Sequence, residues 1–313
     1  GLFCNYRGNF MANIIAVVWD FDKTLLNGYM QEPIFKYYGI DEKSFWGEVG
    51  LLPAKYMSEQ GVRVNPETIY LNQFIRDARD GRMQGLNNEK LKSFGKELKF
   101  YPGIPELFTK TKDFVDQNED YRECGIKLEH YIVSTGMAAI IQGSEIAEYV
   151  DGIWGCEFIE DEQNGVRRIA EIGYTVDNTT KTRAIFEINK GVNKHPEIDV
   201  NIAMPEDARR VKLKNMIYIA DGPSDIPAFS VVRGNGGSTY AIYPKGDINA
   251  FKQVDILHKN DRIDGYSEAD YSEGSQTYLW IMNRIGSIAD KICKDEKSKY
   301  SFDKNSVPKH LNE

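Results

Sequence analysis

The sequence contains few of the residues that bind soft metal ions or cross-link small proteins. Its 313 residues include only four cysteines, Cys4, Cys124, Cys156 and Cys293. None of them forms a C-x-x-C pair or lies near a histidine at the spacing of a metal site. Such scattered cysteines favour reduced thiols, and we therefore expect four free thiols and a cytoplasmic protein. Histidine is equally scarce, and no catalytic spacing relates the four histidines, His130, His195, His258 and His310.

Long hydrophobic runs and excess positive charge are also lacking. The apolar run 14–19 is far shorter than the roughly 20 residues that cross a bilayer. Charged residues follow it at once, which is not the pattern of a signal peptide. The net charge of −8 and the pI of about 5.3 disfavour binding to a nucleic-acid backbone. We expect no membrane and no nucleic-acid partner, and we interpret 1–10 as a polar lead-in with Met11 as a candidate native start.

Three continuous apolar runs predict strands of a parallel sheet that is buried on both faces. They are 14–19, 131–133 and 216–220, with weaker candidates at 240–243 and 254–257. Helical patterns at 104–115, 137–149, 179–188 and 278–292 alternate with these runs. The alternation predicts an α/β fold with a doubly wound parallel sheet, in the Rossmann-like manner.

Two segments depart from that alternation. Residues 28–100 contain no convincing strand, and their apolar residues recur at helical spacing, as in the series Leu71, Phe74, Ile75 and Ala78. We predict a smaller helical cap domain at 28–100, inserted after the first strand of a core domain formed by 11–27 and 101–313. Its aromatic side chains Phe45, Trp46, Tyr56 and Phe74 are typical of a cap core. The second segment, 154–176, is interpreted as a hairpin that turns at Asn164-Gly165.

Acidic and hydroxyl side chains follow each of the three strongest strands. The first is followed by Asp20, Asp22 and Thr24, the second by Ser134, Thr135 and Gly136, and the third by Asp221 and Asp225. In an open α/β sheet the carboxyl ends of the strands form the ligand site. Several acids at one site require a cation, and oxygen ligands without histidine or cysteine select Mg²⁺.

This set of residues is suited to phosphoryl transfer. One acid of the pair Asp20 and Asp22 can attack phosphorus while the other moves a proton. Lys181 opens a predicted helix and is a candidate for the positive charge that the phosphoryl group needs, although Arg183 or Lys190 could take that part. Each motif alone is also compatible with an ordinary turn or helix cap.

The ordered set Asp20-x-Asp22-x-Thr24, Ser134, Lys181 and Asp221-Gly-x-x-Asp225 resembles the four motifs of the haloacid dehalogenase (HAD) superfamily. The resemblance implies that Asp20 is the nucleophile and a metal ligand, and that Asp22 is the acid/base whose carbonyl also binds the metal. It implies that Thr24 shapes the loop and that Ser134, with the amides of Thr135 and Gly136, holds phosphoryl oxygens. Lys181 would bridge nucleophile and phosphate. Asp221 and Asp225 would complete the Mg²⁺ site.

The helical insert resembles the cap of the subgroup that contains phosphoserine phosphatases. The acid that grips the serine amine there has no match, because Tyr29 and Met30 stand near its place and Glu32 only follows later. The expected activity is Mg²⁺-dependent hydrolysis of a small phosphorylated metabolite. A phosphotransferase and a catalytically silent phospho-ligand binder remain alternatives, and the sequence leaves the substrate and the oligomeric state open. The Asp22-Lys23-Thr24 string also mimics the phosphorylation motif of P-type ATPases, which the missing membrane segment argues against.

Overall fold

A seven-stranded sheet forms the centre of the computed structural model, which describes residues 13–305. The strand order is β4-β3-β2-β1-β5-β6-β7, and all neighbours are parallel except β3 and β4. The strands are β1 (Asn13–Trp19), β2 (Ile126–Met137), β3 (Gly152–Gln163), β4 (Val166–Tyr174), β5 (Met216–Ala220), β6 (Ser238–Tyr243) and β7 (Gly265–Glu268). The predicted α/β fold is confirmed, and β1 lies in the middle between β2 and β5.

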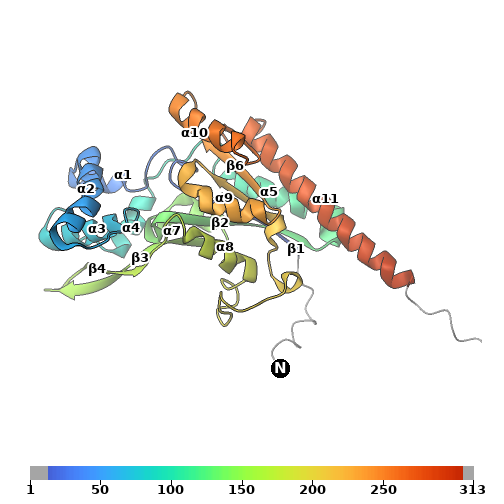
Figure 1. The fold of residues 1–313 in the computed structure, drawn as a ribbon, viewed down its shortest axis with the longest axis horizontal. Coiled ribbons are helices and arrows are strands. Elements are labelled where there is room, and N and C mark those ends of the chain that lie inside the picture. Colours follow the sequence, from blue (N-terminus) through green and yellow to red (C-terminus); the bar gives the residue numbers. More distant parts are fainter. Residues whose placement is uncertain (1–12, 306–313) are drawn as a thin grey trace, which may run out of the picture.

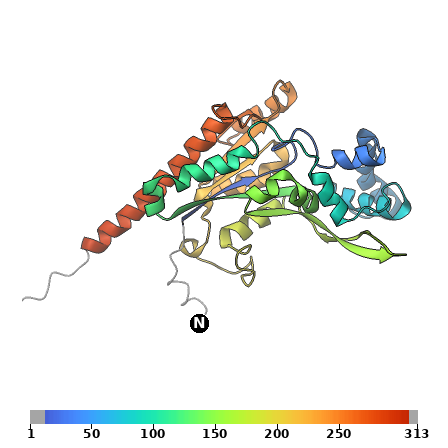
Figure 2. The same ribbon diagram turned by 180° about the vertical axis from the view of Figure 1, so that it is seen from behind.

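Helices cover both faces of the sheet (Figures 1 and 2). On one face α5 (Glu106–Asp116) packs on β2, and α11 (Gln276–Asn305) packs on α5 and β1. On the other face α8 (Lys181–Lys190) packs on β2 and on α9 (Ile226–Gly234). Strand β1 is therefore covered on both sides, which explains why it is an uninterrupted apolar run.

Four helices form the insert after β1. They are α1 (Glu32–Tyr38), α2 (Glu42–Gln60), α3 (Ile69–Asp80) and α4 (Asn88–Gly95). The predicted helical character is confirmed, and Phe45 and Phe74 are fully buried with Phe35 in an aromatic core. The division into two domains at 28 and 100 stays a prediction, but Figure 1 shows the four helices grouped at one end of the molecule. Residues 28–100, which contain these four helices, are called the cap.

A long hairpin of β3 and β4 runs beside the cap. Its turn residues Asn164 and Gly165 both have positive φ, 52° and 76°, as the favoured two-residue turn requires. The amide of Ile169 in β4 donates to the Leu86 carbonyl at 3.0 Å, and the Asn88 side chain donates to the Phe158 carbonyl at 3.0 Å. The predicted hairpin is confirmed, and it also braces the cap against the sheet.

Some predicted elements were wrong. Residues 254–257 belong to α10 (Ile248–Lys259) rather than to a strand, and the last strand is β7. Val254 and Leu257 are buried while Ile256 is 55% exposed, so this short apolar run has the helical period. The predicted helix at 137–149 begins one residue later, as α7 (Ala138–Gly143), and continues as a 3₁₀ turn. Helix α11 extends to Asn305, well beyond the predicted end near residue 292.

The expectation of free thiols throughout was also wrong. Cys124 and Cys293 form a disulfide, with their Cα atoms 5.5 Å apart, whereas Cys156 is free and buried. Cys124 follows α6 (Glu119–Glu123) and Cys293 lies in α11, and the packing of α11 on α6 brings them together across 169 residues of sequence. Cys4, His310, the lead-in 1–10 and Met11 lie outside the described residues.

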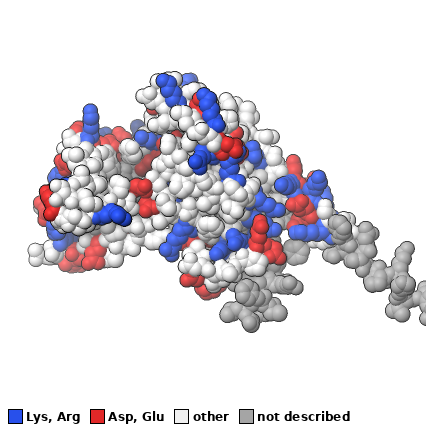
Figure 3. All heavy atoms as spheres, in the orientation of Figure 1, with Lys and Arg blue, Asp and Glu red and all other residues white. Residues whose placement is uncertain are grey.

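Two further observations concern membrane-spanning helices and surface charge. Among residues 13–305, no helix is both long and apolar enough to cross a membrane. On the face shown in Figure 3, basic and acidic side chains lie interspersed over the described part of the chain.

His130 is buried in the core rather than placed for chemistry. Its Nδ1 accepts from the Trp19 indole N–H at 3.0 Å, and its Nε2 lies 2.8 Å from the Thr111 hydroxyl. Because Nδ1 accepts, the neutral ring carries its proton on Nε2 and donates it to Thr111. Burial, with a smaller contribution from the charge of Lys112, lowers the pKa of His130 to about 3. The imidazole is therefore neutral in the folded protein.

We expect this neutral histidine to make stability fall in acid. The unfolded chain takes up a proton on His130 near its ordinary pKa of 6.5, while the folded chain does so only near 3. Stability from this residue is therefore fully present above pH 6.5 and is lost as the pH falls toward 3, by about 1.4 kcal/mol per pH unit. Urea unfolding at pH 7.5, 6.5 and 5.0 measures the slope. His130→Gln should have a shallower slope than wild type, and equal slopes would contradict the assignment.

Candidate active site

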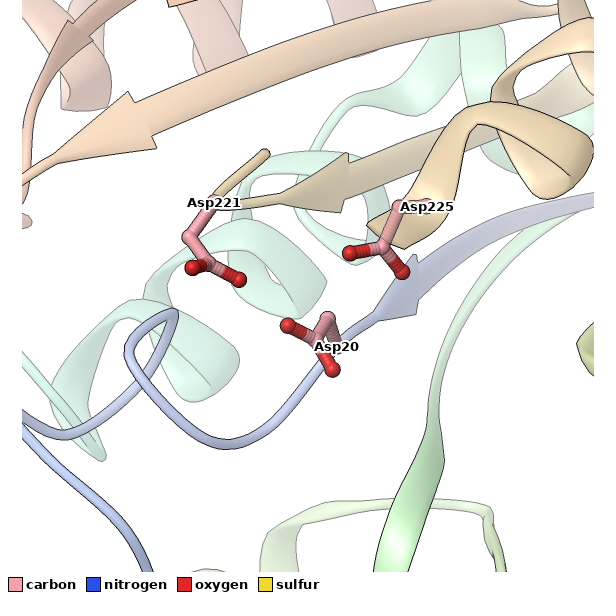
Figure 4. Close-up of side chains that lie close together, drawn as sticks. All are labelled: Asp20, Asp221 and Asp225. Carbon is pink, nitrogen blue, oxygen red and sulfur yellow. The ribbon is translucent and has the colours of Figure 1, made fainter. Parts of the chain in front are cut away.

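The three motif-bearing strands end at one edge of the sheet. Trp19 pairs with Ile132 of β2 and with Ile219 of β5, so the residues that follow these strands emerge side by side. The amide of Asp20 donates to the Ile219 carbonyl at 3.0 Å, which continues the β1–β5 ladder into the site. Ser134 lies two residues beyond Ile132, in the last part of β2. Figure 4 shows the carboxylates of Asp20, Asp221 and Asp225 facing one another at this edge.

Lys181, the first residue of α8, joins two of these acids. Its Nζ lies 2.9 Å from Oδ1 of Asp20 and 2.7 Å from Oδ1 of Asp225. The lysine side chain is only 2% exposed, and Asp225 is fully buried. The hydroxyl of Tyr218 donates to the same Asp225 oxygen at 2.6 Å. Lys181 is thus held at one side of Asp20, where its charge faces the predicted nucleophile.

The two other cations considered for this part lie elsewhere. Arg183 pairs with Glu187 on its own helix at 2.8 Å, and its side chain is 59% exposed. Lys190 donates to the backbone carbonyls of Val200 and Ile202 at 2.6 and 2.8 Å. Lys181 is therefore the cation that the fold brings to Asp20.

The acids outnumber the positive charge that they share. Burial favours a neutral Asp20, but the charge of Lys181 and hydrogen bonds with Asp221, Lys181 and Thr24 hold its pKa below the usual range. Burial and then the negative charge of Asp20 raise the pKa of Asp221 well above its usual range, and the same two causes raise that of Asp225. Like charges this close disfavour ionisation unless a cation joins them. The site is therefore electrostatically suited to a further positive charge.

The geometry of the acids fits a hard metal ion. One carboxylate oxygen from each of Asp20, Asp221 and Asp225 lies within 4.8 Å of the others. A donor set of carboxylate oxygens alone suits Mg²⁺ or a similar hard divalent cation. The Asp22 carboxylate is not part of this group among the described residues. Its predicted contribution through the backbone carbonyl stays a prediction.

Asp22 and Thr24 make different contacts beside Asp20. Lys23, which stands between Asp22 and Thr24, has a left-handed φ of 60°, so the chain turns sharply between these two residues. Asp22 Oδ1 accepts from the Met30 amide at 2.9 Å, while burial and the charge of Asp20 raise the pKa of Asp22 to about 7. The Thr24 hydroxyl donates to Asp20 at 2.9 Å and lies 3.4 Å from Asp221, so it orients these carboxylates, and its predicted part in phosphate binding stays a prediction.

The last part of β2, where its pairing with β3 is irregular between Val133 and Met137, carries a compact group of polar atoms, which we call the phosphate loop (Ser134–Gly136). Ser134 is 2% exposed, and its Oγ accepts from the Gly136 amide at 2.9 Å. A Cβ on Gly136 would lie 2.1 Å from Cε of Met30, so a larger residue does not fit without moving that side chain. Sδ of Met30 in turn accepts from the Met137 amide at 3.2 Å. Met30, at the start of the cap, therefore occupies the Met137 amide directly after this loop.

Sequence reasoning brought out the motif residues of the site but missed other neutral residues that contact them. Tyr218 lies within an apolar run, and Met30 looks like an ordinary core residue. Tyr70, whose hydroxyl donates to the Thr135 carbonyl, stands among the helically spaced residues of α3 and carries no motif. Proximity to a motif is the one signal that could have singled out Met30, which stands close after Asp20-x-Asp22-x-Thr24.

The predicted motif residues meet at the ends of β1, β2 and β5, with Lys181 at the start of α8. Solved structures with a similar chain path include a HAD family hydrolase of Salmonella enterica serovar Typhi (13% identity, TM-score 0.48, covering 82% of this chain and 67% of that one). They also include a phospho-aspartyl intermediate analogue of phosphoserine phosphatase (17% identity, TM-score 0.44, covering 82% and 93%). The chemistry of the present chain is inferred from its own residues.

No family model matches the chain. It is 36% identical over 291 residues to an uncharacterized protein of Borreliella burgdorferi, covering 88% of this chain and 98% of the other. The chain belongs to the same family as that protein.

Proposed function

We propose that the protein hydrolyses a small phosphate monoester in a Mg²⁺-dependent reaction through a phosphoaspartyl intermediate on Asp20. The observation that carries this proposal is the buried ion pair of Lys181 with Asp20, beside the acids Asp221 and Asp225. A nucleophilic carboxylate needs a low pKa and a nearby cation to approach a charged phosphoryl group. Lys181 supplies both conditions at 2.9 Å.

The proposed reaction has two steps, and Asp20 and Asp22 act in both. In the first, an oxygen of Asp20 bonds to phosphorus as the ester P–O bond breaks, and Asp22 gives a proton to the leaving oxygen. In the second, Asp22 takes a proton from water, the water oxygen bonds to phosphorus, and the bond to Asp20 breaks. A pKa of about 7 for Asp22 suits a group that must give and then accept a proton near neutral pH.

The other residues stabilise charge during both steps. Ser134 and the phosphate-loop amides would hold phosphoryl oxygens, once Met30 has moved from the Met137 amide. Asp20, Asp221 and Asp225 would hold Mg²⁺, either directly or through water for Asp225, whose Oδ1 is already bonded to Lys181 and Tyr218. When bound, Mg²⁺ neutralises charge that develops on the phosphoryl oxygens.

The substrate class is a small phosphorylated metabolite, as proposed from the sequence. Beside the predicted site, Lys23 Nζ lies 4.7 Å from the centre of the Tyr29 ring, and no acid stands at position 29 or 30 to bind an amine. This favours a leaving group other than serine. A cytoplasmic location stays a prediction, and the disulfide removes the thiol argument for it, because disulfides persist mainly in oxidising compartments.

Metal removal tests the proposal. Hydrolysis of p-nitrophenyl phosphate should fall to background after treatment with EDTA and dialysis, because the acids then repel both one another and the phosphate. Added Mg²⁺ should restore it, whereas added Na⁺ at equal ionic strength should not. Turnover that survives chelation would contradict the metal assignment, and a wild-type protein that hydrolyses no phosphate ester in a screen of phosphorylated metabolites would contradict the proposed function.

A further inference from the structure

A short segment of the cap, residues 65–70, contacts two loops that carry predicted catalytic groups. The hydroxyl of Tyr70, which is 5% exposed, donates to the Thr135 carbonyl in the phosphate loop at 2.7 Å. Five residues earlier, Asn65 donates to the Asp177 carboxylate at 3.1 Å, and the Glu67 carboxylate accepts from the Asn178 amide at 2.5 Å. Asp177 and Asn178 lie in the turn that leads into α8 and Lys181.

The hydrogen bond of Tyr70 acts on a particular peptide unit. The Thr135 carbonyl and the Gly136 amide belong to the same planar peptide, so fixing the direction of the carbonyl also fixes that of the N–H. Tyr70 holds the carbonyl end, with the Cys156 thiol at 3.4 Å from the same oxygen, while the N–H end points to Ser134 Oγ at 2.9 Å. A donor on the carbonyl also polarises the peptide and strengthens its N–H as a donor.

The phosphate loop would be hard to orient without the hydrogen bond from Tyr70. Ser134 and Gly136 are buried, and among the described contacts the Thr135 carbonyl accepts from two side chains, the Tyr70 hydroxyl of the cap and the Cys156 thiol of β3. A thiol is a weak donor. Met30 offers only a thioether, which is a weak acceptor. Tyr70 is the strong, neutral donor that comes from the cap itself.

We propose that Tyr70 is a positioning residue through which the cap sets the Thr135–Gly136 peptide for phosphoryl binding. Tyr70 does not touch the reacting atoms; it fixes the direction of the peptide whose N–H donates to Ser134 Oγ. Asn65 and Glu67 hold the same segment against the turn before Lys181, so the loop and the lysine are oriented together when the cap lies on the core. This inference rests on the proposed function, because it assigns a role within that site.

The variant Tyr70→Phe removes the hydroxyl and keeps the ring, which packs on Trp46 and Phe74. We expect kcat for p-nitrophenyl phosphate to fall about tenfold, the effect of one hydrogen bond that is needed at the transition state. The inhibition constant of inorganic phosphate should rise several-fold, because the same peptide holds phosphoryl oxygens. The matched control is Tyr56→Phe, a cap tyrosine whose ring faces Arg76 and whose hydroxyl bonds to no described residue. It should match wild type in both measurements.

A purely structural role for Tyr70 would lower the thermal midpoint without changing kcat or phosphate inhibition of the folded fraction. That result, or kinetics equal to wild type, would overturn the proposal while leaving the proposed function intact. If wild type itself is inactive, the proposed function fails instead. Should Tyr70→Phe not fold, Glu67→Ala provides the second test, since it removes the acceptor of the Asn178 amide and loosens the same segment at its half-exposed end. An unchanged kcat in Glu67→Ala would then count against the proposal.

Discussion

Replacing Asp20 with asparagine should reduce turnover of p-nitrophenyl phosphate by at least about a thousandfold, because an amide does not attack phosphorus. The fold should survive the change. Asparagine can still accept the hydrogen bond from Thr24, and losing the charge of Asp20 relieves its repulsion of Asp221 and Asp225. Steady-state release of p-nitrophenol measures the loss, with the thermal midpoint as the check on folding.

A matched substitution separates this effect from a general response to losing an acid. Asp247 caps α10 by accepting from the Ala250 amide, and asparagine caps helices about equally well, so Asp247→Asn should keep full activity. Wild type quenched during turnover should carry a phosphoryl group on the peptide that contains Asp20, and the Asp20→Asn variant should carry none. Retained turnover in that variant would remove Asp20 as the nucleophile.

Replacing Lys181 with methionine should damage both stability and activity. The lysine is the positive partner of two buried carboxylates, and removing one partner of such a group typically costs about 3–5 kcal/mol. Asp225 can regain part of this by taking up a proton, since burial already raises its pKa. Turnover should fall below detection, because the pKa of Asp20 is no longer held down and the phosphoryl group loses its nearby cation.

The expected loss of stability depends on pH in a defined direction. Below the pKa of Asp225 in the variant this acid is protonated, so the difference in unfolding free energy between wild type and variant should shrink as the pH falls. Urea unfolding at pH 5 and pH 8 measures it. The exposed ion pair of Arg183 with Glu187 provides the control, since Arg183→Gln should change stability by less than about 1 kcal/mol. A Lys181→Met protein with wild-type stability and turnover would contradict the role of the ion pair.

Local patterns predicted the parts of the fold that local chemistry controls. The apolar run before Asp20 became the central strand, and Asn164-Gly165 formed the hairpin turn, because burial on both faces and positive φ each demand a narrow choice of residues. The short run 254–257 misled the prediction, since four apolar-rich residues fit a strand and one turn of a helix equally well. Its neighbours, not its own residues, placed it in α10.

The charged residues of the candidate site could be listed from the sequence because each follows a recognisable strand or opens a helix. Their partners could not. Tyr70 is an unremarkable helical tyrosine until the cap lies against the Thr135 carbonyl, and Cys124 reaches Cys293 only because α6 packs on α11. The choice of Lys181 over Arg183 likewise depended on the direction in which α8 presents each side chain, which is known only from the structure.

The amino-acid sequence alone therefore predicted which acids, hydroxyls and strands the chain contains. Strand periodicity and turn chemistry depend on residues only a few positions apart. Contacts between segments remote in sequence decided which lysine meets Asp20, how the cap reaches the phosphate loop, and which cysteines pair. Hydrogen bonds and ion pairs act over only a few ångströms, so these partners are defined only when the sheet and the cap have brought the segments together.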